Sequence, residues 1–117
     1  MTDPRAIHQI SVEELSVRLA SEPNASPQLI DVREPHEVEI ASLEGFENLP
    51  LSEAEEWSPT IRDRFDPNTE TLVLCHHGMR SAQMCHWLTT QGFTNVYNIE
   101  GGIDAYSKIV DRSVPRY

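Results

Sequence analysis

The fold class is decided by residues 71–81, which read TLVLCHHGMRS. The run that ends at Cys75 is apolar after its first residue, which is typical of a short strand buried on both faces of a parallel sheet. A helical pattern follows at 80–91, and its apolar residues at three-residue spacing are expected to face the core: Ala82, Cys85 and Leu88. A buried strand that passes through a short loop into a helix predicts an α/β protein.

Strands and helices alternate along the rest of the chain, so we expect a mostly parallel sheet with helices on both faces. Further strands are predicted at 6–10, 28–32 and 96–99, with a brief one near Asn48 and Leu49. Further helices are predicted at 12–20, 36–39, 52–57, 58–65 and 103–110. Ser11 and Glu14 are expected to form a capping box at the start of the first helix. Ser52 and Ser58 are expected to cap the two middle pieces.

The length and composition suit one soluble domain. A chain of 117 residues with 38% hydrophobic residues buries enough apolar surface to fold without disulfides or a metal, and we expect 1–117 to be a single domain. The longest apolar run is too short to span a membrane, and the first five residues lack the apolar core of a signal peptide. The two cysteines predict no disulfide framework, and a reducing cytoplasm is the expected location.

The negative charge is unevenly distributed along the chain. The net charge of −10 argues against nucleic acids or anionic membranes as partners. The segment from Glu34 to Glu56 contains eight glutamates and no Lys or Arg. From Thr71 to Ile99 there is no acidic residue, and Arg80 is the only fixed charge. The stretch that holds both cysteines is therefore free of negative charge.

Cys75 has the surroundings of a reactive thiol. It ends a central strand, at the edge where open parallel sheets bind ligands, and a helix is expected about five residues later. The loop from His76 to Met79 presents backbone N–H groups and the positive end of a helix dipole, and Gly78 allows it to curl into an anion-binding cradle. Such a cradle, with Arg80 and two histidines nearby, favours the thiolate that acts as a nucleophile.

Three ordered segments of the chain resemble the rhodanese-like family of sulfurtransferases. The first is 29–37, LIDVREPHE, which is similar to the family's Asp-Val-Arg strand end and continues to Gly45 and to LPL at 49–51. The second is 75–81, CHHGMRS, which looks like the family's active-site loop. The third comprises Gly92-Phe93, Val96-Tyr97 and Gly101-Gly102-Ile103. The resemblance implies a rhodanese-like fold with a sheet of about five mostly parallel strands.

The resemblance also implies the chemistry. The Cys75 thiolate is expected to take sulfane sulfur from a small anionic donor such as thiosulfate, and to pass it from a persulfide to cyanide or a thiol, a protein thiol included. No cofactor or metal is expected. The substrate-binding residues are expected in the loop: His76, His77, Gly78, Met79, Arg80 and Ser81. For Arg80 two roles stay open, which are to hold the sulfonate of the donor or to fix the loop.

Asp31 and Arg33 are expected to support the site from the neighbouring strand end. We expect them to pair with each other or with nearby backbone and so to fix the loop beside Cys75, with direct contact of Arg33 to substrate as the alternative. Cys85 is expected to fill the core. The cysteines and histidines between 75 and 86 match no ligand spacing for zinc.

Two other functions stay open. One is a rhodanese-fold arsenate reductase or phosphatase. The loop of the phosphatases that share this fold resembles the pattern Cys-x5-Arg. The spacing from Cys75 to Arg80 is one residue shorter, and a shorter cradle suits a sulfur atom better than a tetrahedral phosphoryl group. The other is a regulatory module that docks partner proteins. A persulfide that persists after thiosulfate treatment would indicate an enzyme and not a docking module.

Overall fold

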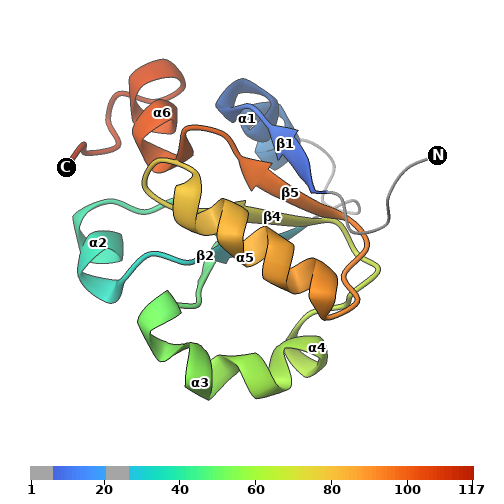
Figure 1. Ribbon diagram of the computed structural model, residues 1–117. Helices are drawn as coiled ribbons and strands as arrows, with labels where there is room; N and C mark the ends of the chain where they lie inside the picture. The colour runs from blue at the N-terminus through green and yellow to red at the C-terminus, as the bar shows by residue number, and fades with distance from the viewer. Residues whose placement is uncertain (1–6, 21–26) are drawn as a thin grey trace.

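Five parallel strands form a sheet in the order β1-β5-β4-β2-β3 (Figure 1). The computed structural model describes residues 7–20 and 27–117. The strands are β1 (His8–Ile10), β2 (Gln28–Asp31), β3 (Glu47–Asn48), β4 (Thr71–Leu74) and β5 (Val96–Ile99). The four strand pairs are all parallel, which confirms the predicted α/β class. Residue 6, the first residue of the predicted first strand, lies outside the described residues.

Helices cover both faces of the sheet (Figure 1). One face carries α1 (Val12–Ala20) and α6 (Gly102–Ile109), and the other carries α3 (Ala54–Trp57), α4 (Ile61–Arg64) and α5 (Met79–Thr90). The short helix α2 (Pro35–Ile40) follows β2. The first helix begins with the expected capping box, because the Glu14 amide donates to Ser11 Oγ at 3.1 Å.

The central strand β4 contributes to two hydrophobic cores. Leu72 and Leu74 pack into the core beneath α1 and α6, whereas Val73 packs into the core beneath α5. This alternation follows the two-residue period of a strand, and it makes β4 apolar on both faces. Cys75 continues the alternation toward α5, although it lies one residue beyond the end of β4 and not within it.

The segment between β3 and β4 is helical, as predicted for 52–57 and 58–65. Each of the two pieces begins as a 3-10 turn, Leu51–Glu53 before α3 and Ser58–Thr60 before α4. No side chain makes a capping hydrogen bond at the start of these four segments, so the predicted serine caps are wrong. The hydroxyl of Ser52 donates instead to the carboxylate of Glu34, just before α2.

The buried face of helix α5 includes one polar side chain. Its buried side chains are Ser81, Met84, Cys85 and Leu88, whereas Ala82 is only half-buried, so the prediction for Ala82 is wrong. This face follows the mixed three- and four-residue spacing of an amphipathic helix. Ser81 lies within it because its hydroxyl faces the Cys75 loop, as described below.

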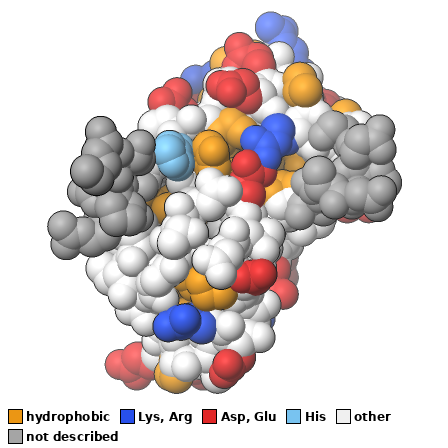
Figure 2. Space-filling model, turned by 90° about the vertical axis from the view of Figure 1, so that its right-hand side faces the viewer, with side chains coloured by type: hydrophobic (Ala, Val, Ile, Leu, Met, Phe, Trp, Pro, Cys, Tyr) orange, Lys and Arg blue, Asp and Glu red, His pale blue; other side chains and the backbone are white. Residues whose placement is uncertain are grey.

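On the side of the molecule where α5 ends, the described residues show no concentration of one charge (Figure 2). Figure 2 shows acidic and basic side chains scattered over this face. Uncharged polar side chains and backbone occupy much of its middle. Among the helices of residues 7–20 and 27–117, none has the length and apolar character needed to cross a membrane.

Candidate active site

A curled loop that begins with Cys75 joins β4 to α5 (Figure 1). The backbone amide of Gly78 donates a hydrogen bond to Cys75 Sγ at 3.0 Å. Gly78 has φ of +101°, and a Cβ at this position would lie 3.2 Å from the backbone nitrogen of Gly101. Glycine is therefore favoured here for its backbone conformation and for the close approach of the next loop. The prediction that Gly78 curls the loop is confirmed.

Ser81 and Asn98 form a second support for the loop. Ser81 is fully buried, and its hydroxyl lies within hydrogen-bond distance of Cys75 Sγ, at 3.3 Å, and of Asn98 Oδ1, at 2.5 Å. Asn98 Nδ2 donates to the carbonyl of Gly78 at 3.1 Å and to Gln9 Oε1 at 3.0 Å. Because these two bonds fix the amide of Asn98, its oxygen faces Ser81. A serine hydroxyl has a single proton, so Ser81 donates either to the sulfur or to Asn98.

The start of α6 is joined to the carbonyls of the same loop. The amides of Ile103 and Asp104 donate to the carbonyl oxygens of Cys75 and His76, at 3.0 and 3.1 Å. A Cβ on Gly102 would lie 2.4 Å from both of these oxygens. The paired glycines of the third segment thus allow α6 to begin directly against the loop.

Arg80 turns its guanidinium toward Glu37 on α2. Its two terminal nitrogens donate to the two carboxylate oxygens of Glu37, at 2.7 and 2.9 Å. The same carboxylate accepts the backbone amide of Glu34 and the hydroxyl of Tyr117, both at 3.0 Å. The hydrogen bond from Arg80 is the main cause that lowers the pKa of Glu37 to about 2, and Glu37 in turn raises the pKa of Arg80. Both groups are therefore ionised, and Arg80 ties the start of α5 to α2.

Asp31 and Arg33 form a buried ion pair beside the loop. Arg33 is 0% exposed, and its Nε and Nη2 donate to Asp31 Oδ1 and Oδ2 at 3.0 and 2.7 Å. Its guanidinium also donates to the backbone carbonyls of Glu37 and Ala41. The expected pairing is present, and burial leaves Arg33 no surface for a substrate.

Three aromatic rings stack at the mouth of the loop. The His76 ring lies between the rings of His77 and Tyr117, with centroid distances of 3.9 and 4.0 Å. Its Nε2 is buried and has no hydrogen-bond partner among the described residues. Burial is the main cause that lowers the pKa of His76, so the predicted assistance from a charged His76 is opposed by its surroundings. The side chains of His77 and Met79 are exposed.

Both cysteines are buried, in different surroundings. Cys75 is 1% exposed, and its sulfur accepts a hydrogen bond from the loop that curls around it. Cys85 is 0% exposed, and burial raises its pKa to about 12. Cys85 therefore remains a thiol that fills the core. Among the described residues, no group of three or more His, Cys, Asp or Glu side chains is arranged to hold a metal ion.

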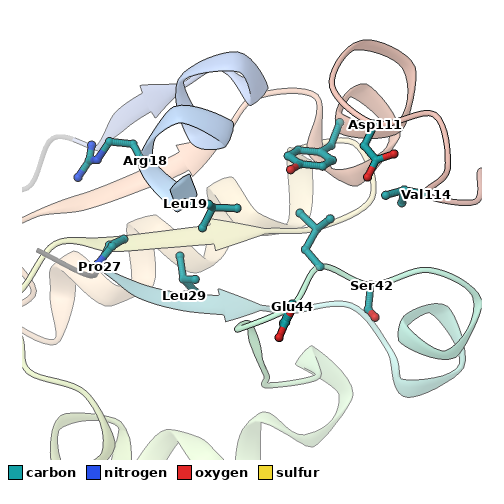
Figure 3. A pocket seen from close by; sticks show the side chains of 10 residues that line it. Arg18, Leu19, Pro27, Leu29, Ser42, Glu44, Asp111 and Val114 are labelled. Carbon is teal, nitrogen blue, oxygen red and sulfur yellow. The ribbon is translucent and has the colours of Figure 1, made fainter. Parts of the chain in front are cut away.

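A pocket that does not include Cys75 lies elsewhere on the molecule. It has a volume of about 530 Å³, and Figure 3 shows residues of α1, of the segment after α2 and of the chain end after α6 around it. Leu19, Leu29 and Val114 belong to the core on the α1 side of the sheet, whereas Cys75 belongs to the core on the α5 side. The pocket is therefore separate from the thiol.

The comparisons with known proteins identify the family of the chain. The family model described as "Rhodanese-like domain" matches residues 11–109. The chain belongs to the rhodanese-like domain family. This rhodanese-like domain is 47% identical, over its whole length, to the Arabidopsis thaliana protein named "Rhodanese-like/PpiC domain-containing protein 12, chloroplastic", and it spans 40% of that protein. The cytoplasmic location predicted above therefore stays a prediction.

Two further similarities concern proteins of about the same length as the domain. A protein of Allochromatium vinosum named "Sulfurtransferase" is 29% identical, over 87% of this chain and 90% of its own length. The crystal structure of a rhodanese-like domain protein from Staphylococcus aureus has a TM-score of 0.73 and 25% identity, and covers 95% of this chain and 99% of that one. The rhodanese-like fold expected from the sequence is thus confirmed.

Sequence reasoning missed three residues that support the loop: Glu37, Asn98 and Tyr117. Glu37 lies within the segment that carries the resemblance, but nothing local connects it with Arg80. Asn98 could have been noticed in the sequence, because it is the one amide side chain in an otherwise apolar and aromatic strand. A buried polar group in such a strand needs hydrogen-bond partners, which predicts a supporting role. No pattern around Tyr117 indicates its contacts.

Proposed function

We propose that this rhodanese-like domain is a sulfurtransferase that carries sulfane sulfur as a persulfide on Cys75. The observation that carries the proposal is the Gly78 amide 3.0 Å from Cys75 Sγ, in a loop that leads into the twelve-residue helix α5. A backbone N–H and the positive end of a helix dipole both favour negative charge on a sulfur atom. The persulfide is also anionic, so the same groups stabilise it once it has formed.

The reaction has two displacement steps at sulfur. The Cys75 thiolate attacks the sulfane sulfur of a donor, a sulfur–sulfur bond forms, and the remainder of the donor leaves with the electrons of the broken bond. An acceptor, either a cellular thiol or cyanide in an assay, then attacks the outer sulfur and restores the thiolate. Ser81 and the Gly78 amide are proposed to hold the charged sulfur in both steps.

The remaining loop residues are proposed to shape the site. His76, His77 and Met79 surround the approach to the sulfur, with His77 and Met79 exposed to an incoming reactant. For Arg80, the two hydrogen bonds to Glu37 favour the role of fixing the loop over that of holding a sulfonate. Asp31 and Arg33 are proposed as positioning residues, because both are buried and Arg33 bonds to Tyr117, whose ring stacks on His76.

The phosphatase and arsenate reductase alternatives have less support. Both need room for a tetrahedral oxyanion and a cation to hold it. Cys75 is 1% exposed at the start of a short loop, and both terminal nitrogens of Arg80 are bonded to Glu37. A bare sulfur atom needs neither the room nor the cation.

Intact-protein mass spectrometry tests the proposal. The purified domain is incubated separately with thiosulfate and with glutathione persulfide, and we expect a stable gain of one sulfur atom from at least one donor. Cys75→Ser should abolish the gain, whereas Cys85→Ser should retain it, which separates the two cysteines. A folded wild-type protein that stays unmodified with both donors would instead support a docking module.

A further inference from the structure

The guanidinium groups of Arg33 and Arg80 are each paired with one carboxylate. Arg80 donates from both terminal nitrogens to Glu37, and Arg33 is buried against Asp31. Within residues 7–20 and 27–117, the recorded donors to Cys75 Sγ are the Gly78 amide and the Ser81 hydroxyl, and no cation is among them. The loop therefore offers neutral hydrogen-bond donors to its substrate.

The next cations along the mouth of the loop are also paired. Lys108 and Arg116 both lie 3.2 Å from Asp104, whose backbone amide is bonded to the carbonyl of His76. His77 lies 3.8 Å from the same carboxylate. In the described part of the chain, these positive charges are thus paired with acidic groups.

This arrangement distinguishes between two classes of sulfur donor. In thiosulfate the charged sulfonate is bonded directly to the sulfur that is transferred, so it lies against the mouth of the loop while that sulfur reaches Cys75. Removing water from such a charge without a cationic partner is unfavourable, and Cys75 is 1% exposed. In an alkyl persulfide the transferred sulfur is bonded to an uncharged sulfur, and the charged parts of the carrier can remain in solvent.

We propose that the sulfur donor of this domain is an alkyl persulfide and that Glu37, by neutralising Arg80, disfavours thiosulfate. The inference rests on the sulfurtransferase activity proposed above. The Cys75 thiolate attacks the outer sulfur of the persulfide R–S–SH, and the bond from Sγ to that sulfur forms. The bond between the two sulfurs of the donor breaks, its electron pair stays on the departing thiol sulfur, and that sulfur takes the proton of the outer one. The products are the anionic Cys75 persulfide and the thiol R–SH.

Single-turnover loading of Cys75, followed by intact mass, tests this inference. Wild-type protein is mixed with equal concentrations of glutathione persulfide or thiosulfate, and with persulfidated serum albumin in a third arm that separates small from protein-borne donors. We expect loading at least about tenfold faster from one of the persulfides than from thiosulfate, since an unpaired buried charge is worth that much or more. Equal or faster loading from thiosulfate would overturn the inference while leaving the proposed function intact. Loading from none of the three would overturn both.

Substitution of Glu37 separates the role of charge from the intrinsic reactivity of the donors. Glu37→Gln frees the charge of Arg80, so we expect the ratio of thiosulfate loading to persulfide loading to rise about tenfold. Glu39→Gln changes the same net charge at an exposed residue of α2 and should leave the ratio unchanged. A folded Glu37→Gln protein with an unchanged ratio would contradict the inference.

A second variant covers the case in which Glu37→Gln does not fold. The double variant Glu37→Gln/Arg80→Gln leaves neither charge unpaired, so if Arg80 does not hold the donor, loading from both donors should change by the same factor. A selective loss of thiosulfate loading in this double variant would show that Arg80 binds the sulfonate, and the inference would be wrong.

Discussion

The hydroxyl of Tyr117 lies 3.0 Å from Glu37 Oε1, and this hydrogen bond joins residues that are eighty positions apart. The same hydroxyl accepts a hydrogen bond from Arg33 Nη1 at 3.0 Å. Tyr117 therefore connects the two ion pairs that flank the loop, Asp31 with Arg33 and Glu37 with Arg80. Its ring also stacks on His76, so the last residue of the chain packs directly against the candidate site.

Removing this hydroxyl should destabilise the protein. In Tyr117→Phe, two charged groups lose a partner while the ring remains, and we expect the free energy of unfolding to fall by about 1–3 kcal/mol. Urea unfolding measures this change. Tyr97→Phe is the matched control, because the recorded contact of Tyr97 is a ring stack on His8. Equal effects of the two variants would contradict the connecting role of Tyr117.

The ionisation of Glu37 predicts a dependence of stability on pH. Its pKa is about 2 in the folded protein, below the ordinary value of 4.5, mainly because Arg80 donates hydrogen bonds to it. In acid the unfolded chain binds this proton before the folded protein does, so stability rises with pH in that window. We expect the stabilisation from Glu37 to be complete above pH 4.5 and to be lost as the pH falls toward 2.

Urea unfolding at a series of pH values below 5 measures this contribution. Glu37→Gln should show a shallower loss of stability with acid than wild type, whereas Glu39→Gln should follow wild type. Parallel curves for wild type and Glu37→Gln would show that Glu37 does not contribute in this way.

The parts of the fold that the sequence predicts are set by local interactions. The strand at 71–74 is a continuous apolar run, and the curl at Gly78 follows from the backbone freedom of glycine. In the segment at 51–64 the two helical pieces were predicted, but their 3-10 turns were not, and the predicted serine caps are absent. Its four turns and helices are too short to be stable alone, and they are held by the packing of Trp57 and Ile61 in the core.

The candidate site shows the same division between local and distant contacts. Asp31 and Arg33 are two residues apart on one strand end, so their pairing could be predicted. The contacts of Arg80 with Glu37 and of Asn98 with Gly78 join residues on different elements. A single sequence contains no information about which distant residues meet, and these contacts came only from the structure.

Gly102 provides a prediction about backbone crowding. In Gly102→Ala the new methyl group would lie 2.4 Å from the carbonyl oxygens of Cys75 and His76, so the loop or α6 has to move. We expect a loss of several kcal/mol in the free energy of unfolding. Gly92→Ala is the matched control, since Gly92 has a similar positive φ, but its Cβ would lie 3.8 Å from the nearest atoms, on Arg62. Gly92→Ala should cost only about 1 kcal/mol, for the backbone conformation.

The hydroxyl of Ser81 provides the sharpest test of the loop chemistry. Ser81→Ala removes a donor 3.3 Å from Cys75 Sγ and leaves the Gly78 amide in place. A hydrogen bond to a charged group contributes about 1.5–3 kcal/mol, so we expect sulfur loading of Cys75 to slow by about tenfold to a hundredfold.

Ser107→Ala is the matched control for this prediction. Ser107 is a buried serine of α6 whose hydroxyl donates to the carbonyl of Val114, and it makes no recorded contact with the Cys75 loop. Both variants should lose about 1 kcal/mol of stability, because each leaves one buried acceptor without its donor. Only Ser81→Ala should slow the loading of Cys75. If the two variants slowed loading equally, the effect of Ser81 would be one of stability alone, and the sulfur would depend on the Gly78 amide as its single donor.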